Sequence, residues 1–236
     1  MNERQRVDGL STWYLEQQLD FDRRLIGFRY RSLRPHLRGP RGLELGPAEG
    51  LMTRLLLPHF ERLTVVDGSL ELLERIPPAP TLVKVHALFE ELALPEPADT
   101  VILEHVLEHV ADPVGLLRRA RSFLAPGGRM ILGVPNGHSL HRLVGVKMGL
   151  LEDPCALNER DHALGHRRVY TPASVERDVS AAGLRLRERW GVFLKPLSNR
   201  QMEEQWDEAL IEGFYELGKD FPDHACEIQC LCDAPA

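Results

Sequence analysis

Hydrophobic positions follow two spacings along the chain. From residue 11 to residue 37, apolar residues recur every three or four positions, which is typical of an amphipathic helix or helix pair. Beyond residue 41, short apolar runs alternate with amphipathic stretches, and this alternation predicts a parallel sheet with helices on both faces. The runs predict strands over residues 42–45, 62–66, 81–86, 100–103 and 129–134.

The helices predicted between these strands cover residues 51–59, 70–75 and 113–124. The third helix precedes "APGG", in which Gly127 and Gly128 are expected to supply the positive φ of a helix C-cap. Residues 137–170 then interrupt the alternation. After a predicted helix at 139–150 they show no clean periodicity, which is typical of an inserted lid or substrate loop.

Regular structure returns at Thr171, a good N-cap, and the helix that it begins should end near Gly183. A strand at 184–194, a helix at 199–217 and a last strand at 225–232 are predicted after it. The length of 236 residues favours one domain over 1–236. Its expected parts are a helical cap at 1–40, a ligand-binding core at 41–136, a lid at 137–170 and the C-terminal part of the sheet at 171–236.

The charge pattern argues against a nucleic-acid partner. The formal net charge is −6, and residues 196–236 hold ten acids against one Arg and one Lys. The nine arginines of residues 1–42 are interleaved with five acids at helical spacing, which favours a solvated helix face. No apolar run reaches the ~18 residues of a membrane span, and the polar start lacks a secretory apolar segment. A cytoplasmic protein without membrane contact, with its four cysteines reduced, is therefore expected.

The stretch "LELGPAEG" at 43–50 predicts a loop that passes close to a ligand after the first strand. A dinucleotide fingerprint would need glycines at 46, 48 and 51, but Ala48 and Leu51 stand there, and no GK[ST] phosphate loop follows. Asp67 closes the next strand, 21 positions after Gly46, where a carboxylate can accept hydrogen bonds from both ribose hydroxyls. These features favour a nucleoside cofactor without phosphates.

The motifs resemble those of class I S-adenosylmethionine (SAM) dependent methyltransferases, especially the small-molecule group, whose first motif is (E/D)xGxGxG. Here that motif reads Glu44-Leu45-Gly46-Pro47-Ala48-Glu49-Gly50. The resemblance continues through "VHALFEEL", "DTVILEHVLEHVADP" and "FLAPGGRMILGVPN" and covers residues 40–137. It implies a Rossmann-like, doubly wound α/β sheet of seven mostly parallel strands, with 225–232 antiparallel, an N-terminal helical cap and an inserted lid after strand five.

The resemblance also implies SAM as cofactor and residues that hold it. Two positions depart from the family pattern, Ala48 for the central glycine and Leu88 for an acid near adenine. Each feature has an ordinary alternative: the glycines could mark a plain turn, Asp67 could cap a helix, and Trp13 with Tyr14 could pack in the core. The implied cofactor-binding residues are Glu44, Gly46, Pro47, Ala48, Gly50, Asp67, Gly68, Ser69, Leu88, Phe89, Glu104 and Tyr14.

Methyl transfer is an in-line displacement, so positioning dominates and a general base assists when the acceptor is a hydroxyl. The candidate bases are His105, at the end of strand four, and His162 and His166 in the lid; His109 is expected to be structural. A metal is a competing hypothesis, because His105 with His109 and His162 with His166 have i,i+4 spacing. Small-RNA 2′-O-methyltransferases place two glutamates three apart before a His, whereas Glu104 and Glu108 are four apart, so no metal is expected.

The lid supplies hydrogen-bonding groups for a polar substrate, and the expected substrate-binding residues are Arg160, Arg168, Tyr170 and Asn136. The favoured function is SAM-dependent methylation of a small polar, hydroxylated molecule, such as a sugar or a secondary-metabolite intermediate, on oxygen. The alternatives are an N-methyltransferase of an amino sugar, an RNA 2′-O-methyltransferase and a non-catalytic regulatory subunit with this fold. A monomer or homodimer is expected.

Overall fold

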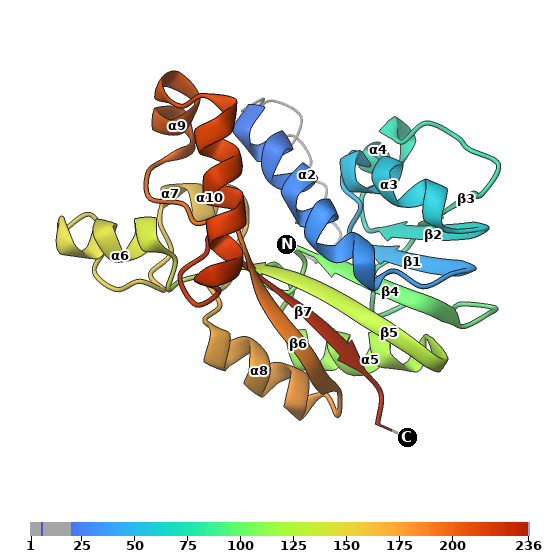
Figure 1. The fold of residues 1–236 in the computed structure, drawn as a ribbon. Helices are drawn as coiled ribbons and strands as arrows, with labels where there is room; N and C mark the ends of the chain where they lie inside the picture. The colour runs from blue at the N-terminus through green and yellow to red at the C-terminus, as the bar shows by residue number, and fades with distance from the viewer. Residues whose placement is uncertain (1–5, 7–19, 236) are drawn as a thin grey trace.

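The computed structural model describes residue 6 and residues 20–235, which form one seven-stranded sheet with helices on both faces (Figure 1). The strand order is β3-β2-β1-β4-β5-β7-β6, and β7 runs antiparallel to both of its neighbours. This is a doubly wound α/β sheet, so the predicted fold class is confirmed. The strands are β1 Arg41–Leu45, β2 Arg62–Asp67, β3 Leu82–His86, β4 Ala98–Glu104, β5 Leu124–Pro135, β6 Arg185–Val192 and β7 Glu227–Asp233.

Consecutive residues of β4 point to opposite faces of the sheet and divide the core in two. Leu103 belongs to an apolar cluster that includes residues of α5 and α8, whereas Ile102 belongs to one that includes residues of α2, α3 and α4. The helices are α2 Asp20–Leu33, α3 Leu51–Leu56, α4 Leu70–Arg75, α5 Pro113–Ser122, α6 Leu140–Lys147, α7 Glu159–Ala163, α8 Pro172–Ala181, α9 Asn199–Gln205 and α10 Glu208–Asp220, with 3-10 turns η1 Arg34–His36 and η2 Leu57–His59.

Helix α2 crosses the sheet beside α10 (Figure 1). Its apolar side joins a third cluster with Phe193, which follows β6, and with residues of α9 and α10. Phe28 stacks on Tyr215 of α10 with ring centroids 4.5 Å apart. The N-terminal segment therefore packs on the C-terminal part of the chain. Trp13 and Tyr14 lie outside the described residues.

Several helix predictions were wrong at their ends. The helix predicted at 51–59 is α3 followed by η2, because Pro58 lacks the N–H that would continue the α-helix. Gly127 and Gly128 do not cap α5; they lie inside β5, which begins two residues after that helix ends. The helix predicted at 199–217 is α9 and α10, separated where Trp206 takes an extended conformation and Asp207 caps α10.

The segment 137–170 is an ordered excursion whose ends lie side by side. Its base is closed by a bridge between Asn136 and Tyr170. Within it lie α6, shorter than the predicted helix at 139–150, and α7, which was not predicted. Arg142 of α6 is buried and donates to the carbonyl oxygens of Pro154 and Ala156 and to Asp161 of α7. One arginine thus holds the loop between the two helices.

Among the described helices, none combines the length and apolar character that a membrane span requires.

Candidate active site

A pocket of about 610 Å³ opens where the parallel strands end. The loop after β1 and the ends of β4 and β5 contribute Gly46, Glu104 and Pro135 to its lining. Helix α2 and the start of β7 contribute Arg29 and Glu227, and the 137–170 segment closes another side. The carboxyl ends of the strands, near the point where strand order reverses, are where doubly wound sheets bind their ligands.

Three residues of the loop after β1 take left-handed backbone conformations, with φ of 74° at Gly46, 46° at Ala48 and 82° at Gly50. A Cβ on Gly46 would lie 2.8 Å from the side chain of Val106, and one on Gly50 would lie 2.8 Å from Ile76. Glycine is therefore required at these two positions, whereas Ala48 accepts a strained conformation. Four consecutive residues of this loop, 46–49, line the pocket.

Two carboxylates flank this loop. Glu44 in β1 is buried and accepts a hydrogen bond from Thr53 Oγ1 at 2.7 Å. Asp67 ends β2 and accepts one from the backbone N–H of Ser69 at 2.8 Å, and Ser69 itself caps α4. Asp67 is therefore not the N-cap of this helix. Burial raises the pKa of Glu44 to about 7 and that of Asp67 to about 6.

The other predicted residues of the cofactor region gather around the same loop. Gly68 and Ser69 follow Asp67, and the ring of Phe89 lies 3.8 Å from a Cβ built on Gly46. Leu88 and Phe89 are partly buried beyond the end of β3. Six of the predicted cofactor residues lie outside the pocket lining: Gly50, Asp67, Gly68, Ser69, Leu88 and Phe89. A tight loop between two buried carboxylates, without a phosphate-binding lysine, fits the phosphate-free nucleoside of SAM.

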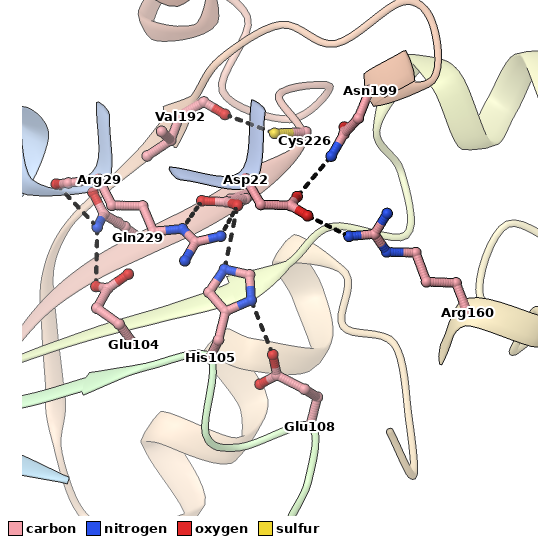
Figure 2. Close-up of polar contacts among 11 residues, drawn as sticks. Asp22, Arg29, Glu104, His105, Glu108, Arg160, Val192, Asn199, Cys226 and Gln229 are labelled. Carbon is pink, nitrogen blue, oxygen red and sulfur yellow. Dashed lines mark hydrogen bonds and ion pairs between the residues drawn. The ribbon is translucent and has the colours of Figure 1, made fainter. Parts of the chain in front are cut away.

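A network of buried charges lies beside the loop (Figure 2). Arg29 donates from Nε and Nη2 to the two carboxylate oxygens of Glu227, at 2.7 and 2.6 Å. His105 stands between two carboxylates: its Nε2 lies 3.3 Å from Glu227 and its Nδ1 lies 3.2 Å from Glu108. Glu104 accepts a hydrogen bond from Gln229. The network joins α2, β4 and β7.

The charges determine what His105 can do. Burial and Arg29 disfavour its protonated form, but Glu227 and Glu108 favour that form more strongly and raise the pKa of His105 to about 9. His105 also has a φ of 56°, which is uncommon for a residue other than glycine. In this arrangement His105 is an imidazolium at neutral pH and therefore a hydrogen-bond donor.

A second histidine-carboxylate pair comes from the lid. His166 Nδ1 lies 3.1 Å from Asp161 Oδ1, and the other oxygen of Asp161 accepts hydrogen bonds from Arg142 and from the backbone of Asn158. Burial would raise the pKa of Asp161, but the hydrogen bond from His166 and these partners outweigh it and lower the pKa to about 2. Asp161 is thus ionised and orients the ring, and Nε2 of His166 forms no hydrogen bond with the residues that the structure describes.

The same lid is tied to the N-terminal and C-terminal helices. Asp22 of α2 accepts a hydrogen bond from Arg160 at 2.6 Å and another from Asn199 of α9 at 2.6 Å (Figure 2). All three residues line the pocket. Segments far apart in the sequence therefore share one wall.

A metal-ligating group is also present among the described residues. Glu108, His109 and His166 can each offer one ligand atom, and these atoms lie within 4.8 Å of one another. Burial lowers the pKa of His109 to about 4, which keeps its imidazole neutral. The group differs from both histidine pairs that the sequence spacing suggested.

Three predicted site residues lie elsewhere, and these predictions were wrong. His162 is exposed outside the pocket lining. Arg168 donates to the carbonyl oxygens of Leu107 and Val110, so its charge holds the segment after β4. Tyr170 is 1% exposed, and its hydroxyl donates to Asp178.

Asn136 does line the pocket, as predicted, but its side chain is already engaged. The amide nitrogen donates to the carbonyl oxygens of Asp223 and Ala225, and the amide oxygen accepts from the backbone of His138. Asn136 thus fixes the start of the lid against the segment before β7.

Several pocket residues were not predicted. Arg29 was assigned to a solvated helix face, because its spacing cannot show that Glu227 lies opposite. Asp161 could have been found from the sequence "NERD", because Asn158 and Asp161 form a capping box. Lys195 and Glu227 carry no local signal, since only the fold brings them to the pocket.

The fold and the glycine loop define a Rossmann-like methyltransferase. The chain belongs to the family whose model is described as "Methyltransferase domain", which matches residues 16–189. It is therefore a SAM-dependent methyltransferase, as the resemblance implied.

Curated relatives and solved structures agree with this class. The chain is 27% identical over 179 residues to a ubiquinone biosynthesis O-methyltransferase of Aeromonas salmonicida, covering 69% of this chain and 70% of that protein. It is 29% identical over 189 residues to a protein of the same description from Xanthomonas euvesicatoria, covering 74% and 75%.

Two solved structures share the fold. One is the N-methyltransferase NodS of Bradyrhizobium japonicum in complex with S-adenosylhomocysteine (SAH), with a TM-score of 0.58 and 18% identity over 95% of this chain and 92% of that one. The other is a SAM-dependent methyltransferase of Mesorhizobium loti, with a TM-score of 0.63 and 18% identity over 88% and 99%.

Proposed function

We propose that the protein methylates a hydroxyl oxygen of a small polar molecule. The observation that supports this best is the His166–Asp161 pair, which stands in the same pocket as the glycine loop. A histidine whose ring is oriented by a carboxylate is suited to take the proton that a hydroxyl loses on methylation. The relatives described as ubiquinone biosynthesis O-methyltransferases support oxygen as the acceptor.

Glu44, the loop from Gly46 to Gly50 and Asp67 would hold the cofactor. SAM, when bound, supplies an electrophilic methyl group. The carboxylate of Asp67 would accept hydrogen bonds from the ribose hydroxyls, and Gly68, Ser69, Leu88 and Phe89 would stand beside the adenosine. Glu104 and Glu44, which line the pocket, would add polar contacts to the cofactor.

The two histidines take different parts. His166 would accept the hydroxyl proton at Nε2 while Asp161 stabilises the imidazolium that forms. Both ring nitrogens of His105 face carboxylates, those of Glu108 and Glu227, so His105 would act by fixing these groups beside the acceptor rather than by donating to it. Arg160 would contribute a further polar contact from the lid wall.

The test is release of SAH from SAM in the presence of pooled hydroxylated metabolites. His166→Ala and His105→Ala should retain SAH binding and lower single-turnover rates by ~10²-fold, the scale of a lost general acid–base group. His162→Ala, an exposed histidine outside the pocket, is the matched control and should leave the rate unchanged.

Other outcomes of this assay would redirect the proposal. Near wild-type rates for both pocket variants from pH 6 to 8 would contradict histidine catalysis, and turnover only with amino sugars would indicate N-methylation. Loss of turnover in a chelator would indicate that Glu108, His109 and His166 hold a metal.

A further inference from the structure

Lys195 brings an unpaired positive charge to the lid end of the pocket. It follows β6, lines the pocket and is partly buried. Its ammonium forms no hydrogen bond or ion pair within the part of the chain that the structure describes. Burial accordingly lowers the pKa of Lys195. A partly buried cation without an ion-pair partner loses part of its hydration, and a bound anion would offset that loss.

The acids near this end are already engaged. Asp22 accepts hydrogen bonds from Arg160 and Asn199. Asp161 pairs with Arg142 and His166, and Glu227 pairs with Arg29 and His105. Each of these carboxylates has at least two partners. Asp22 and Glu227 attract the charge of Lys195 from a distance, but neither forms an ion pair with it in the part of the chain that the structure describes.

His141 offers a second unsatisfied group beside the lysine. Its backbone N–H donates to the carbonyl oxygen of Lys195 at 3.0 Å, which places the start of α6 against this residue. Its Nδ1 is buried without a hydrogen-bond partner among the described residues, and the side chain lines the pocket. Burial lowers the pKa of His141 to about 3, so its ring is neutral and can carry a proton on Nδ1 to donate.

The place of Lys195 in the sheet separates it from the cofactor loop. Along the pocket edge, the loop after β1 is followed by the ends of β4 and β5, the start of β7 and then the end of β6. Four strand spacings of about 4.8 Å put roughly 19 Å between the β1 and β6 positions. His105, after β4, lies between these two ends of the pocket.

We infer that Lys195 and His141 form a subsite for an oxyanion, a carboxylate or a phosphate, carried by the methyl acceptor at a distance from the hydroxyl that is methylated. The inference rests on the proposed function in taking the acceptor to be a small hydroxylated molecule. It narrows that class to hydroxylated acids. The ammonium would pair with the oxyanion while His141 donates to it from Nδ1.

The first test measures the subsite without turnover. SAH-loaded protein is trace-acetylated with acetic anhydride, and the extent of acetylation at Lys195 is compared with that at Lys219, an exposed lysine. Benzoate or phenyl phosphate should slow acetylation of Lys195 at least fivefold and leave Lys219 unchanged, and the more protective probe identifies the preferred oxyanion. Equal protection by sodium chloride at the same ionic strength would overturn the inference.

A second control distinguishes protection of Lys195 by the cofactor from protection by another ligand. If SAH alone protects Lys195 fully when compared with the SAH-free protein, the oxyanion is the carboxylate of the cofactor, and the inference fails. If SAH alone leaves Lys195 reactive, and benzoate or phenyl phosphate then protects it, the subsite belongs to another ligand.

The second test uses turnover with hydroxylated acids and their primary amides as matched acceptors. The wild type should show at least a tenfold higher kcat/KM for the acid of a pair, Lys195→Met should abolish this preference, and Lys195→Arg should restore part of it. Arg200→Met, at a side chain that is 82% exposed, is the control and should keep the preference.

An unchanged preference for the acid in Lys195→Met would overturn the inference. Absence of methylation for every acceptor, with Lys195 still protected by benzoate or phenyl phosphate, would contradict the proposed function alone.

Discussion

Ala48 has a left-handed backbone conformation, which is strained because its Cβ lies too close to the following carbonyl oxygen. We expect Ala48→Gly to raise the free energy of unfolding by roughly 0.5–1 kcal/mol, because relief of the strain exceeds the freedom that glycine adds to the unfolded chain. Chemical denaturation measures this. The control is Ala181→Gly, on an exposed turn of α8, which should lower the free energy of unfolding by about 1 kcal/mol. Losses of equal size in both variants would contradict the strain at residue 48.

Asp67 should control cofactor affinity through its charge. Burial raises the pKa of Asp67 to about 6, so its carboxylate is protonated as pH falls below 6. If this carboxylate accepts from ribose as proposed, SAH affinity should weaken from pH 7 to pH 5. At pH 7.5, Asp67→Asn should weaken SAH binding by about 1.5–3 kcal/mol. Calorimetry at several pH values tests both effects, with exposed Glu96→Gln as the control. A pH response of the same size in Asp67→Asn would assign the titration to another group, such as Glu44.

At the scale of single residues, the sequence could predict the positions that belong to a local motif. Gly46 follows β1 and Asp67 ends β2, and the structure places Asp67 against the loop that Gly46 begins, where it accepts from the backbone of Ala48. Arg168 and Tyr170 have the same polar character as site residues, but they bind the backbone and Asp178 instead. Residue type alone cannot distinguish a polar side chain that binds a ligand from one that forms hydrogen bonds within the protein.

At the scale of elements, α2 is held by ion pairs of different burial. Arg29 of α2 and Glu227 of β7 are 15% and 5% exposed at their side chains, whereas Arg24 and Glu208 are 39% and 78% exposed. We expect Arg29→Met to lower the free energy of unfolding by about 3 kcal/mol, because Glu227 loses the main partner of its buried charge. Arg24→Met should change it little, since solvent screens that pair. Equal effects in urea unfolding would contradict the assigned burial of the two pairs.

Periodicity predicted the strands of the sheet and most helices, because each element must bury one face. It failed where a single residue ends an element inside an apolar pattern. Trp206 takes an extended conformation although the pattern continues, and Asp207, whose side chain accepts from Leu210, begins a new helix. The short helix α7 was not predicted, because five residues are too few to show a helical period of hydrophobic positions.

For the whole molecule, cofactor binding should appear as thermal stability. SAH at 100 times its Kd should add about 2.7 kcal/mol to the free energy of unfolding, if it binds the folded state alone. For a chain of this size that corresponds to a rise in Tm of about 5–11 °C. NAD at the same concentration should leave Tm unchanged, because the loop has Ala48 and Leu51 where a pyrophosphate site needs glycines. A larger shift with NAD would contradict the assignment of the loop to SAM.

The position of β7 has a consequence for synthesis on the ribosome. This strand lies between β5 and β6 although both precede it in the chain, and its first residue, Glu227, is 198 positions from Arg29. A nascent chain that has emerged only as far as β6 therefore exposes two unpaired strand edges, which are sites of aggregation. It also holds Arg29 without its counter-ion. The pocket can be completed only when β7 is inserted between β5 and β6. The methyltransferase site would therefore form late in synthesis and in one step.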